Sequence, residues 1–256
     1  MEDEKKTFTG MKENHIEGRN AVLEAFRSGK TIDKLYVLDG CQDGPVRSIT
    51  REARKHDTIV NYVTKERLDQ ISETGKHQGV IAVSAAYDYA RVEDILALAE
   101  KKGEQPFILI LDGIEDPHNL GAIIRTANQA GAHGVIIPKR RAVGLTPTVA
   151  RTSAGAVNYV PVAKVTNISN TMKELKDRGM WFVCADMDGT LMYDMDLTGP
   201  IGLVIGNEGD GVSPLVKKNC DMVASIPMKG DIDSLNASVA AGVLSYEIVR
   251  QRMKKG

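Results

Sequence analysis

The sequence predicts an α/β protein of two domains, the larger of which holds a parallel sheet covered by helices on both faces. Strand-like apolar runs alternate with helix-like segments along most of the chain. The apolar runs of the second half are continuously hydrophobic, which is typical of parallel strands buried on both sides. A length of 256 residues suits two modest domains or one large one.

The first half is expected to form a small α/β domain over residues 13–86. It follows a charged, pattern-free stretch, residues 1–12, that we expect to be a disordered lead-in. The predicted elements are, in order, a helix over 16–29 closed by Gly29, a strand over 33–40, a helix over 45–57, a strand over 58–64, a short helix over 65–72 and a strand over 79–85.

A polar connection over residues 87–105, with a helix in its middle, is predicted to link this domain to a second one over residues 106–256. The second domain repeats the alternation of strands and helices. Its strands are expected at 107–113, 134–138, 158–162, 181–186, 202–207 and 222–227, and its helices near Asn119, Thr146, Ile168, Ser213 and Ser234. The last helix has small residues on one side, which permit close packing against another helix.

Composition excludes several classes of protein. Hydrophobic residues make up 42% and charged residues 26%, the profile of a soluble globular chain. No apolar run reaches the ~20 residues of a membrane span, and the first residues are too polar for a signal peptide. Cys41, Cys184 and Cys220 are far apart and lack ligand spacing. We therefore expect no structural metal, no disulfide framework and a reducing, cytoplasmic location.

A formal net charge of −1 means that any nucleic-acid binding must depend on local basic patches. Two groups of basic residues are candidates, one on a predicted helix of the first domain and one after a strand of the second. By themselves such groups are more often solvated surface than a binding site. They are Arg47, Arg51, Arg54 and Lys55, and Lys139, Arg140 and Arg141.

Three glycine-containing loops follow predicted strands of the second domain, where ligands of parallel sheets bind. They are residues 112–121, 205–214 and 226–238. None has the GK[ST] of a phosphate-binding loop, and none is a GxGxxG fingerprint of a dinucleotide site. Exposed backbone with a few polar side chains suits a small, compactly bent ligand held mainly by main-chain groups.

A competing motif is DMDGT, residues 186–190, after an apolar strand. It resembles the nucleophile motif of aspartyl phosphatases, in which Asp186 would attack phosphate, Asp188 would act as acid and base, and magnesium would be needed. The partners that such a site needs are poorly placed; they would be Lys217 or Lys218 together with Asp231 and Asp233. A polar turn closing the strand is the favoured interpretation.

Taken in order, the three loops resemble the motifs of the SpoU (TrmH-type) branch of the SPOUT RNA 2′-O-ribose methyltransferases. They read NLGAIIRTA, GNEGDG and IPMKGDIDSLNAS, and the resemblance extends over residues 107–252. The first half is similar to the small, ribosomal-protein-like RNA-binding domain of this family, on the stretches HIEGRNAVLEA and KHQGV. Within the branch the chain is most similar to the guanosine-2′-O-methyltransferases of large-subunit rRNA.

The resemblance implies a catalytic domain with a C-terminal trefoil knot, although knots are very rare. It implies S-adenosylmethionine as cofactor, bound in a bent form, and an obligate homodimer with sites at the interface. The expected substrate is structured RNA, with rRNA favoured and tRNA the alternative. An inactive RNA-binding relative is the remaining possibility, and retention of the motif residues argues against it.

The resemblance also assigns roles to the motif residues. Arg125, among apolar neighbours on its helix, is expected to be buried beside the RNA phosphate and the reacting ribose hydroxyl. It would either act as the general base or, because arginine keeps its proton, lower the pKa of that hydroxyl electrostatically. Asn119 is expected to cap the helix, to support the site, or both. Glu208 would orient Arg125 or Asn119.

The remaining assignments concern the third motif, the cofactor and the RNA. Ser234 and Asn236 would either cap a helix or contact the active site, and the resemblance favours contact. Gly206, Ile226, Met228 and Leu235 are expected to hold the cofactor by main-chain groups and apolar side chains. The candidate RNA contacts are Arg19, Lys139, Arg140, Arg141 and Arg151.

Overall fold

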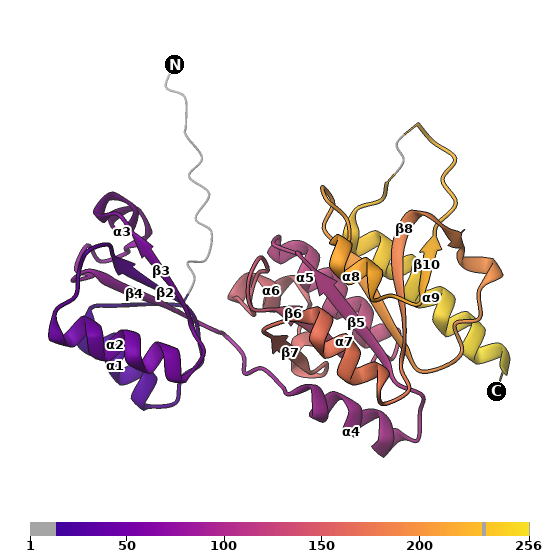
Figure 1. Ribbon diagram of the computed structural model, residues 1–256, viewed down its shortest axis with the longest axis horizontal. Coiled ribbons are helices and arrows are strands. Elements are labelled where there is room, and N and C mark those ends of the chain that lie inside the picture. Colours follow the sequence, from indigo (N-terminus) through magenta and orange to yellow (C-terminus); the bar gives the residue numbers. More distant parts are fainter. Residues whose placement is uncertain (1–13, 232–233, 256) are drawn as a thin grey trace. The chain divides into compact units, whose positions relative to one another are not determined.

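The computed structural model describes residues 14–231 and 234–255 (Figure 1). The predicted lead-in over residues 1–12 therefore lies outside the described residues. Contacts divide the chain into two compact units. The first is Met1–Asp88 with Gly144–Pro147, and the second is Tyr89–Val143 with Thr148–Gly256.

The first unit contains a four-stranded mixed sheet in the order β1-β4-β2-β3. β2 pairs parallel with β3 and antiparallel with β4. Helices α1 and α2 pack their apolar residues, such as Val22 and Ile49, on this sheet. The elements are β1 (His15–Glu17), α1 (Arg19–Arg27), β2 (Ile32–Leu38), α2 (Gly44–Lys55), β3 (Ile59–Val63), α3 (Lys65–Ile71) and β4 (Val80–Ser84).

The helix predicted over 16–29 is wrong at its start. His15–Glu17 forms a short strand that pairs antiparallel with β4, and α1 begins only at Arg19. Gly18 separates the two elements with φ 89°, a left-handed value that helices of L-residues do not contain. A three-residue strand is too short to give an alternating pattern, so the apolar residues of α1 dominated the sequence signal.

The second unit contains a six-stranded sheet in the order β10-β8-β9-β5-β6-β7, and all its pairings are parallel. The parallel α/β fold that the sequence predicts is therefore confirmed. The strands are β5 (Phe107–Asp112), β6 (Gly134–Pro138), β7 (Val162–Val165), β8 (Trp181–Leu191), β9 (Ile201–Gly206) and β10 (Met222–Ser225). The helices are α4 (Val92–Lys102), α5 (Pro117–Gln129), α6 (Pro147–Thr152), α7 (Ile168–Lys176), α8 (Pro214–Lys218) and α9 (Ala237–Lys255), with 3₁₀ turns at Ala156–Asn158 and Met192–Asp194.

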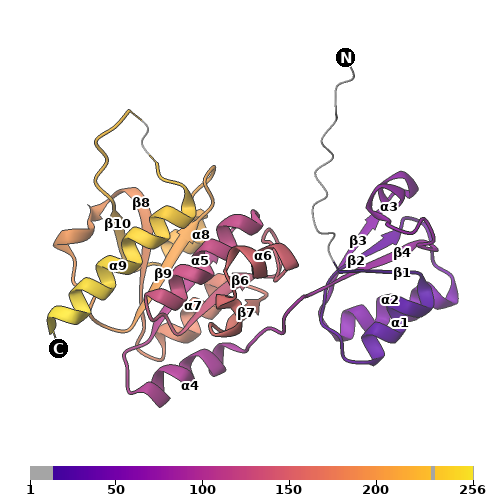
Figure 2. The same ribbon diagram turned by 180° about the vertical axis from the view of Figure 1, so that it is seen from behind.

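Helices cover both faces of this sheet. Helices α4, α7 and α8 supply Ile95, Met172 and Val216 to one apolar cluster with the strands. α5 and α9 pack against each other on the opposite face, as Figure 2 shows. Burying each large apolar side chain of these layers contributes about 1.5–3 kcal/mol, which explains why the strands lack polar residues along their central length.

The strand order reverses between β5 and β9. From β5 the chain builds β6 and β7 on one side, and it then returns to place β8, β9 and β10 on the other. Such a reversal leaves a crevice outside the carboxyl ends of the two central strands, because their following connections leave in opposite directions. The loops after Asp112 and Gly206 therefore meet at this edge.

Two strand predictions in the second unit are wrong. The segment 158–162 is not a strand; a 3₁₀ turn ends at Asn158, and β7 begins at Val162. β8 does not stop at Asp186 but continues to Leu191. Its pairing with β10 jumps from Cys184 to Thr190, so that residues 185–189 form a wide bulge rather than the expected closing turn.

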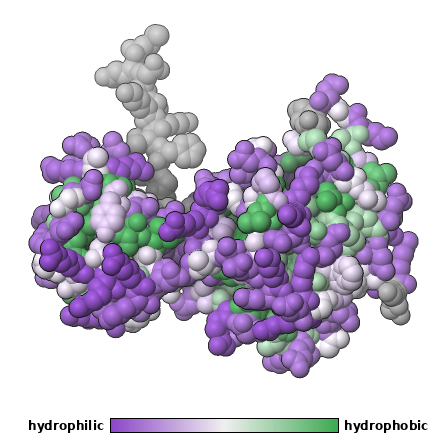
Figure 3. Space-filling model, in the orientation of Figure 1, coloured by the Kyte–Doolittle hydropathy of each residue, from purple (hydrophilic) through white to green (hydrophobic). Residues whose placement is uncertain are grey.

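Other expectations concern the chain as a whole. The trefoil knot is compatible with the observed strand order and stays a prediction. No helix within residues 14–231 and 234–255 is long and apolar enough to cross a membrane. Hydrophilic residues occupy most of the surface seen in Figure 3.

Candidate active site

A cavity of about 570 Å³ lies at the carboxyl ends of β8, β9 and β10. This volume falls within the range of small-ligand sites. Three segments line it: the bulge of β8, the loop after β9, and the stretch from Ile226 to the start of α9. The lining residues are Ala185, Asp186, Met187, Asp188, Ile205, Gly206, Asn207, Glu208, Gly209, Asp210, Gly211, Lys217, Ala224, Ile226, Met228, Ser234, Leu235, Ala237 and Ala240. All four predicted cofactor-binding residues are among them.

A polar cluster of Asn119, Glu208 and Asn236 joins the three motif loops. The Asn119 amide donates to the Glu208 carboxylate. The Asn236 amide donates to the Asn119 carbonyl oxygen at 3.0 Å and to Glu208 at 3.1 Å. These side chains are separated by as many as 117 positions in sequence, so only the fold brings them together.

Local structure explains the position of Asn119. Asp116 caps α5 by accepting the amide of His118 at 3.0 Å, and Pro117 occupies the first turn. The prediction that Asn119 caps this helix is therefore wrong. Asn119 lies in the first turn with 6% of its surface exposed, and its side chain is directed to Glu208 and Asn236.

The loop after β9 is shaped by Gly206 and Asn207. A Cβ atom on Gly206 would lie 2.0 Å from the carbonyl carbon of Gly211, so no larger residue fits where the loop folds back. The Asn207 side chain accepts the amides of Gly209 and Asp210 at 2.9 and 2.7 Å. This turn holds Glu208 at the mouth of the cavity.

The start of α9 supplies the third part of the cluster. The helix begins at Ala237 rather than near Ser234. The Asn236 side chain accepts the amides of Ser238 and Val239 at 3.0 and 3.4 Å while its own amide donates into the cluster. Asn236 therefore both caps α9 and contacts the site. Ser234 lines the cavity as an exposed side chain.

The bulge of β8 supplies a wall that sequence reasoning missed. Lys217 on α8 pairs with Asp186 at 2.6 Å. The hydrogen bond from Lys217, supported by the amide of Asp188, holds the pKa of Asp186 below its usual value, and the same bond raises the pKa of Lys217. The Asp186 carboxylate also accepts the amide of Asp188 at 3.2 Å. The sequence signals were the DMDGT motif, read there as a closing turn, and its Gly189, whose Cβ would lie 2.5 Å from the carbonyl oxygen of Val223.

Lys217, one partner that the aspartyl-phosphatase interpretation needs, does lie at Asp186, but Asp231, another required partner, does not line the cavity with them. Asp233, one of the partners that interpretation required, lies outside the described residues. Among the residues that are described, no group of three or more His, Cys, Asp or Glu side chains is arranged to hold a metal ion.

Arg125 does not join the cluster. It is six residues beyond Asn119, which on an α-helix rotates it by about 240° around the axis. The side chain is exposed and does not line the cavity, so the prediction of a buried arginine is wrong. Its neighbours Ile123, Ile124 and Ala127 are instead among the buried residues of α5, which packs against α9 and β6.

The predicted RNA contacts lie in both units. In the first unit, Arg19 pairs with Asp43 at 2.7 Å and donates to the backbone oxygen of Gln78 at 3.1 Å. This arginine is thus engaged within the chain. In the second unit, Arg140, Arg141 and Arg151 are exposed, and Lys139 is half-buried after β6.

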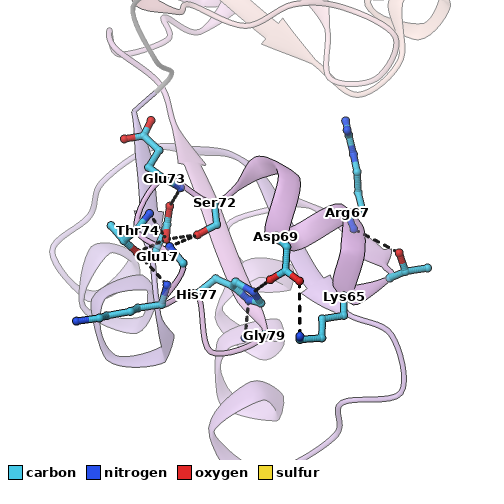
Figure 4. A network of polar contacts seen from close by, with 12 residues as sticks. Glu17, Lys65, Arg67, Asp69, Ser72, Glu73, Thr74, His77 and Gly79 are labelled. Carbon is cyan, nitrogen blue, oxygen red and sulfur yellow. Dashed lines mark hydrogen bonds and ion pairs between the residues drawn. The ribbon is translucent and has the colours of Figure 1, made fainter.

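The loop that holds Gln78 is ordered by a network around Glu17 (Figure 4). The Glu17 carboxylate accepts hydrogen bonds from the Ser72 hydroxyl, from the Thr74 hydroxyl and from the backbone amides of Glu73 and Thr74. Burial opposes the charge, but these donors lower the pKa of Glu17 to about 2. Gln78 has φ 51°, a strained value of the kind found at functional loops.

Known families match both units. The chain matches the SpoU rRNA Methylase family model over residues 106–246. It matches a second model, RNA 2′-O ribose methyltransferase substrate binding, over residues 15–90. The two matches cover separate stretches of the chain, with residues 91–105 between them.

A relative and three solved structures are similar over most of their length. YacO of Bacillus subtilis, named as a TrmH family tRNA/rRNA methyltransferase, is 48% identical over 95% of this chain and 98% of its own. The SpoU methyltransferase AviRb of Streptomyces viridochromogenes with AdoMet aligns with TM-score 0.60 and 28% identity, covering 94% of this chain and 90% of its own. An AdoMet-bound rRNA methyltransferase of Sinorhizobium meliloti aligns with TM-score 0.58 and 25% identity, covering 93% of this chain and 87% of its own. The TrmH/SpoU tRNA modifying enzyme of A. aeolicus aligns with TM-score 0.55 and 32% identity, covering 64% of this chain and 85% of its own.

The family models, the relative and the structures agree with the three motifs and with the meeting of those motifs in the Asn119–Glu208–Asn236 cluster. The resemblance inferred from the sequence is confirmed. This chain belongs to the SpoU (TrmH-type) family of RNA methyltransferases.

Proposed function

We propose that the protein transfers a methyl group to the 2′-hydroxyl of a ribose in RNA, and that its substrate is a guanosine of rRNA. The observation that carries this proposal is the Asn119–Glu208–Asn236 cluster beside a ligand-sized cavity. Polar side chains that hold one another in place at the carboxyl ends of the strands are suited to orient a reacting group.

S-adenosylmethionine is the methyl donor of the family, and the cavity suits it. Its volume of about 570 Å³ accommodates a bent nucleoside. Ile226, Met228 and Leu235 offer apolar contact to a base, and Gly206 brings main-chain atoms to the same wall. We assign these four residues to cofactor binding.

The bound donor supplies an electrophilic methyl group, so the chain's own residues must position and activate the hydroxyl. We assign Asn119, Glu208 and Asn236 to orienting the reacting groups, with Ser234 beside them. Arg125 is assigned to the RNA phosphate and to stabilising the negative charge that develops on the ribose oxygen. Because arginine keeps its proton, a substrate phosphate or water would accept the proton of the hydroxyl.

The exposed position of Arg125 supports a homodimer. The cavity of one chain contains no arginine, so this residue would have to reach a site on a second copy. Helix α9 offers a surface for that copy: Val239, Tyr246 and Met253, at intervals of seven residues, are 48%, 50% and 78% exposed. The small residues Ala241 and Ser245 are instead buried within the chain, so they do not support the dimer.

The extent of the structural matches favours rRNA over tRNA. The rRNA methyltransferase covers 93% of this chain, whereas the tRNA modifying enzyme covers 64%. The part of this chain left over in the second comparison is as large as its substrate-binding half. tRNA remains the alternative, since the relatives' shared name includes both RNAs.

Exposed basic residues after β6 supply the RNA contacts in this proposal. Arg140 and Arg141 extend from the same sheet edge as the cavity. Phosphate contacts of this kind give affinity that falls with salt and depends little on sequence. Arg140→Ala is therefore expected to weaken binding to every RNA and to flatten the salt dependence by about one unit of slope, measured by filter binding. A loss confined to one sequence would contradict this role.

We also propose a cytoplasmic location, where rRNA is available.

The test of the proposed function is methyl transfer from tritiated S-adenosylmethionine to bulk rRNA and to bulk tRNA. Label in rRNA, in a nucleotide whose ribose resists alkali and which digestion identifies as guanosine, is the expected result. Label in tRNA alone would select the alternative substrate. Tight RNA binding without label would make the chain a binding module and overturn the proposed reaction.

A further inference from the structure

The charges around the cavity are strongly unbalanced. Among the residues that the structure describes, five charged side chains line it: Asp186, Asp188, Glu208, Asp210 and Lys217. Four carboxylates and one ammonium give a formal charge of −3, although the whole chain carries only −1. A cavity so charged discriminates between ligands that differ in charge.

Two of the four carboxylates are already neutralised or bonded. Asp186 is paired with Lys217 at 2.6 Å, which also removes the one positive charge that would repel a cationic ligand. Glu208 accepts hydrogen bonds from Asn119 and Asn236. The carboxylates of Asp186 and Glu208 are therefore both bonded to side chains of the same chain.

The other two carboxylates are available to a ligand. Within the described part of the chain, no side chain is hydrogen-bonded to the carboxylate of Asp188 or of Asp210, and both residues are exposed at the cavity. Asp188 interacts with Lys217 only through their charges, because the Lys217 ammonium is bonded to Asp186. Each is held by its backbone: the amide of Asp188 donates to Asp186 at 3.2 Å, and the amide of Asp210 donates to Asn207 at 2.7 Å. They lie on two different walls, the β8 bulge and the loop after β9.

The bulge fixes Asp188 in place. Ser225 on β10 donates to the carbonyl oxygen of Gly189 at 3.0 Å, and Lys217 holds the other end through Asp186. A carboxylate mounted on a segment tied at both ends meets its ligand without a large ordering cost. Asp188 is thus the better placed of the two free carboxylates.

We propose that Asp188, with Asp210 opposite, makes the cavity select the sulfonium form of the methyl donor over the thioether product. This inference rests on the proposed function. The donor and the product differ by one methyl group and one positive charge at sulfur. When the methyl group leaves, the charge disappears, and the attraction of the carboxylates for that end of the ligand disappears with it. The same carboxylates that favour donor binding therefore favour product release.

The experiment compares binding of three ligands by isothermal titration calorimetry: S-adenosylmethionine, S-adenosylhomocysteine, and the analogue in which a protonated amine replaces the methylated sulfonium. In Asp188→Asn, affinity for the two cationic ligands is expected to fall on the order of tenfold, and affinity for the thioether is expected to change less than about twofold. The amine analogue lacks the methyl group, so a parallel loss for both cations assigns the effect to charge.

Asp177→Asn, at the residue that follows α7, is the matched control, because it makes the same chemical change on an exposed aspartate outside the cavity lining. Its three affinities should equal those of the unmodified chain. Raising the salt concentration to about 1 M, where the screening length falls to about 3 Å, should reduce the donor preference of the unmodified chain towards that of Asp188→Asn.

The outcomes separate this inference from the proposed function. Equal losses for all three ligands, or no loss for any, overturn the selection by charge while leaving methyl transfer standing. Failure of the unmodified chain to bind either the donor or the product would overturn the proposed function itself. Thermal unfolding of each variant identifies a general loss of folding, in which case Asp188→Glu, which keeps the charge, must restore the preference.

Discussion

Asn119 is the side chain on which the three motif loops converge, because it donates to Glu208 and accepts from Asn236. Asn119→Ala is expected to lower the rate of methyl transfer on the order of 10²-fold, the usual effect of removing one preorganised polar group from an active site. Donor affinity should change little, since Asn119 does not line the cavity. Single-turnover transfer and calorimetry measure the two effects separately.

Asn128→Ala is the control for this change, because it removes the same amide from an exposed position of the same helix. If both variants lose activity equally, the helix rather than the cluster is responsible. If neither does, Asn119 has no role in the reaction.

Glu17 permits a prediction about pH. Its pKa is lowered from 4.5 to about 2, so the carboxylate stabilises the fold at pH values above 4.5, and this contribution is lost as the pH falls towards 2. Glu17→Gln should therefore destabilise the first unit at pH 7 by roughly 1–3 kcal/mol and have little effect near pH 2. Chemical unfolding followed by circular dichroism over this pH range measures the difference.

Hydrogen exchange of residues 72–79 locates the effect of Glu17→Gln, because the amides of Glu73 and Thr74 donate to this carboxylate. Glu24→Gln is the control, since Glu24 is an exposed residue that meets Arg27 only at 3.9 Å. A loss of stability that stayed constant from pH 7 to pH 2 would contradict the electrostatic explanation.

The observed positions of the motif residues show which of their properties the sequence could predict. The three motifs identified Asn119, Glu208 and Asn236, and the structure brings them into contact. The sequence did not predict their contact pattern, because hydrogen bonds across 89 and 117 positions depend on the whole fold. Arg125 was misjudged because apolar neighbours on a helix do not imply that the intervening residue is buried.

At the scale of elements, Gly206 gives a sharp contrast with a second glycine of the same loop. A Cβ on Gly206 would overlap the backbone of Gly211 at 2.0 Å, whereas a Cβ on Gly209 would meet only the Asn207 side chain at 3.7 Å. Gly206→Ala is expected to displace the loop, to reduce donor affinity more than tenfold and to lower the thermal midpoint. Gly209→Ala should leave both nearly unchanged. Equal behaviour of the two variants would contradict this account of the loop.

Most elements of the sheet were predictable because long apolar runs bounded by glycine or polar residues define buried strands. β5 and β9 were placed within a residue or two of their observed bounds. β1 was missed because it has three residues, and the bulge of β8 was missed because its five looped-out residues interrupt a pairing that only β10 defines. Pairing is a property of two strands, so one strand's sequence cannot specify it.

At the scale of the whole molecule, negative and positive charges gather in different places. The chain is nearly neutral, but carboxylates gather at the cavity and exposed arginines follow β6. In the proposed function, a cationic donor and an anionic RNA would thus be attracted to neighbouring regions of one sheet edge. A net charge sums such opposite local charges to nearly zero. The composition of the chain therefore did not decide whether it binds RNA.

Subunit mixing tests whether Arg125 serves the cavity of a second copy. In a mixed dimer of Arg125→Ala and Glu208→Gln chains, one cavity keeps Asn119 and Glu208 and receives Arg125 from the other chain. Each parent should be nearly inactive. An equal mixture, after exchange of subunits, should recover about a quarter of the normal activity, because half the dimers are mixed and each has one complete site.

The control mixture combines Asn119→Ala with Glu208→Gln, two changes within the cluster of a single chain. No cavity in any of its dimers is complete, so no activity should return. Sedimentation must show that mixed dimers form in both experiments, and Tyr246→Glu on the exposed face of α9 should prevent them. Recovery in neither mixture, despite mixed dimers, would place Arg125 and Glu208 in the same chain's site. If the unmodified protein sediments as a monomer, the proposed dimer is wrong. The proposal that Arg125 on α5 acts in the cavity of a second copy is then wrong as well.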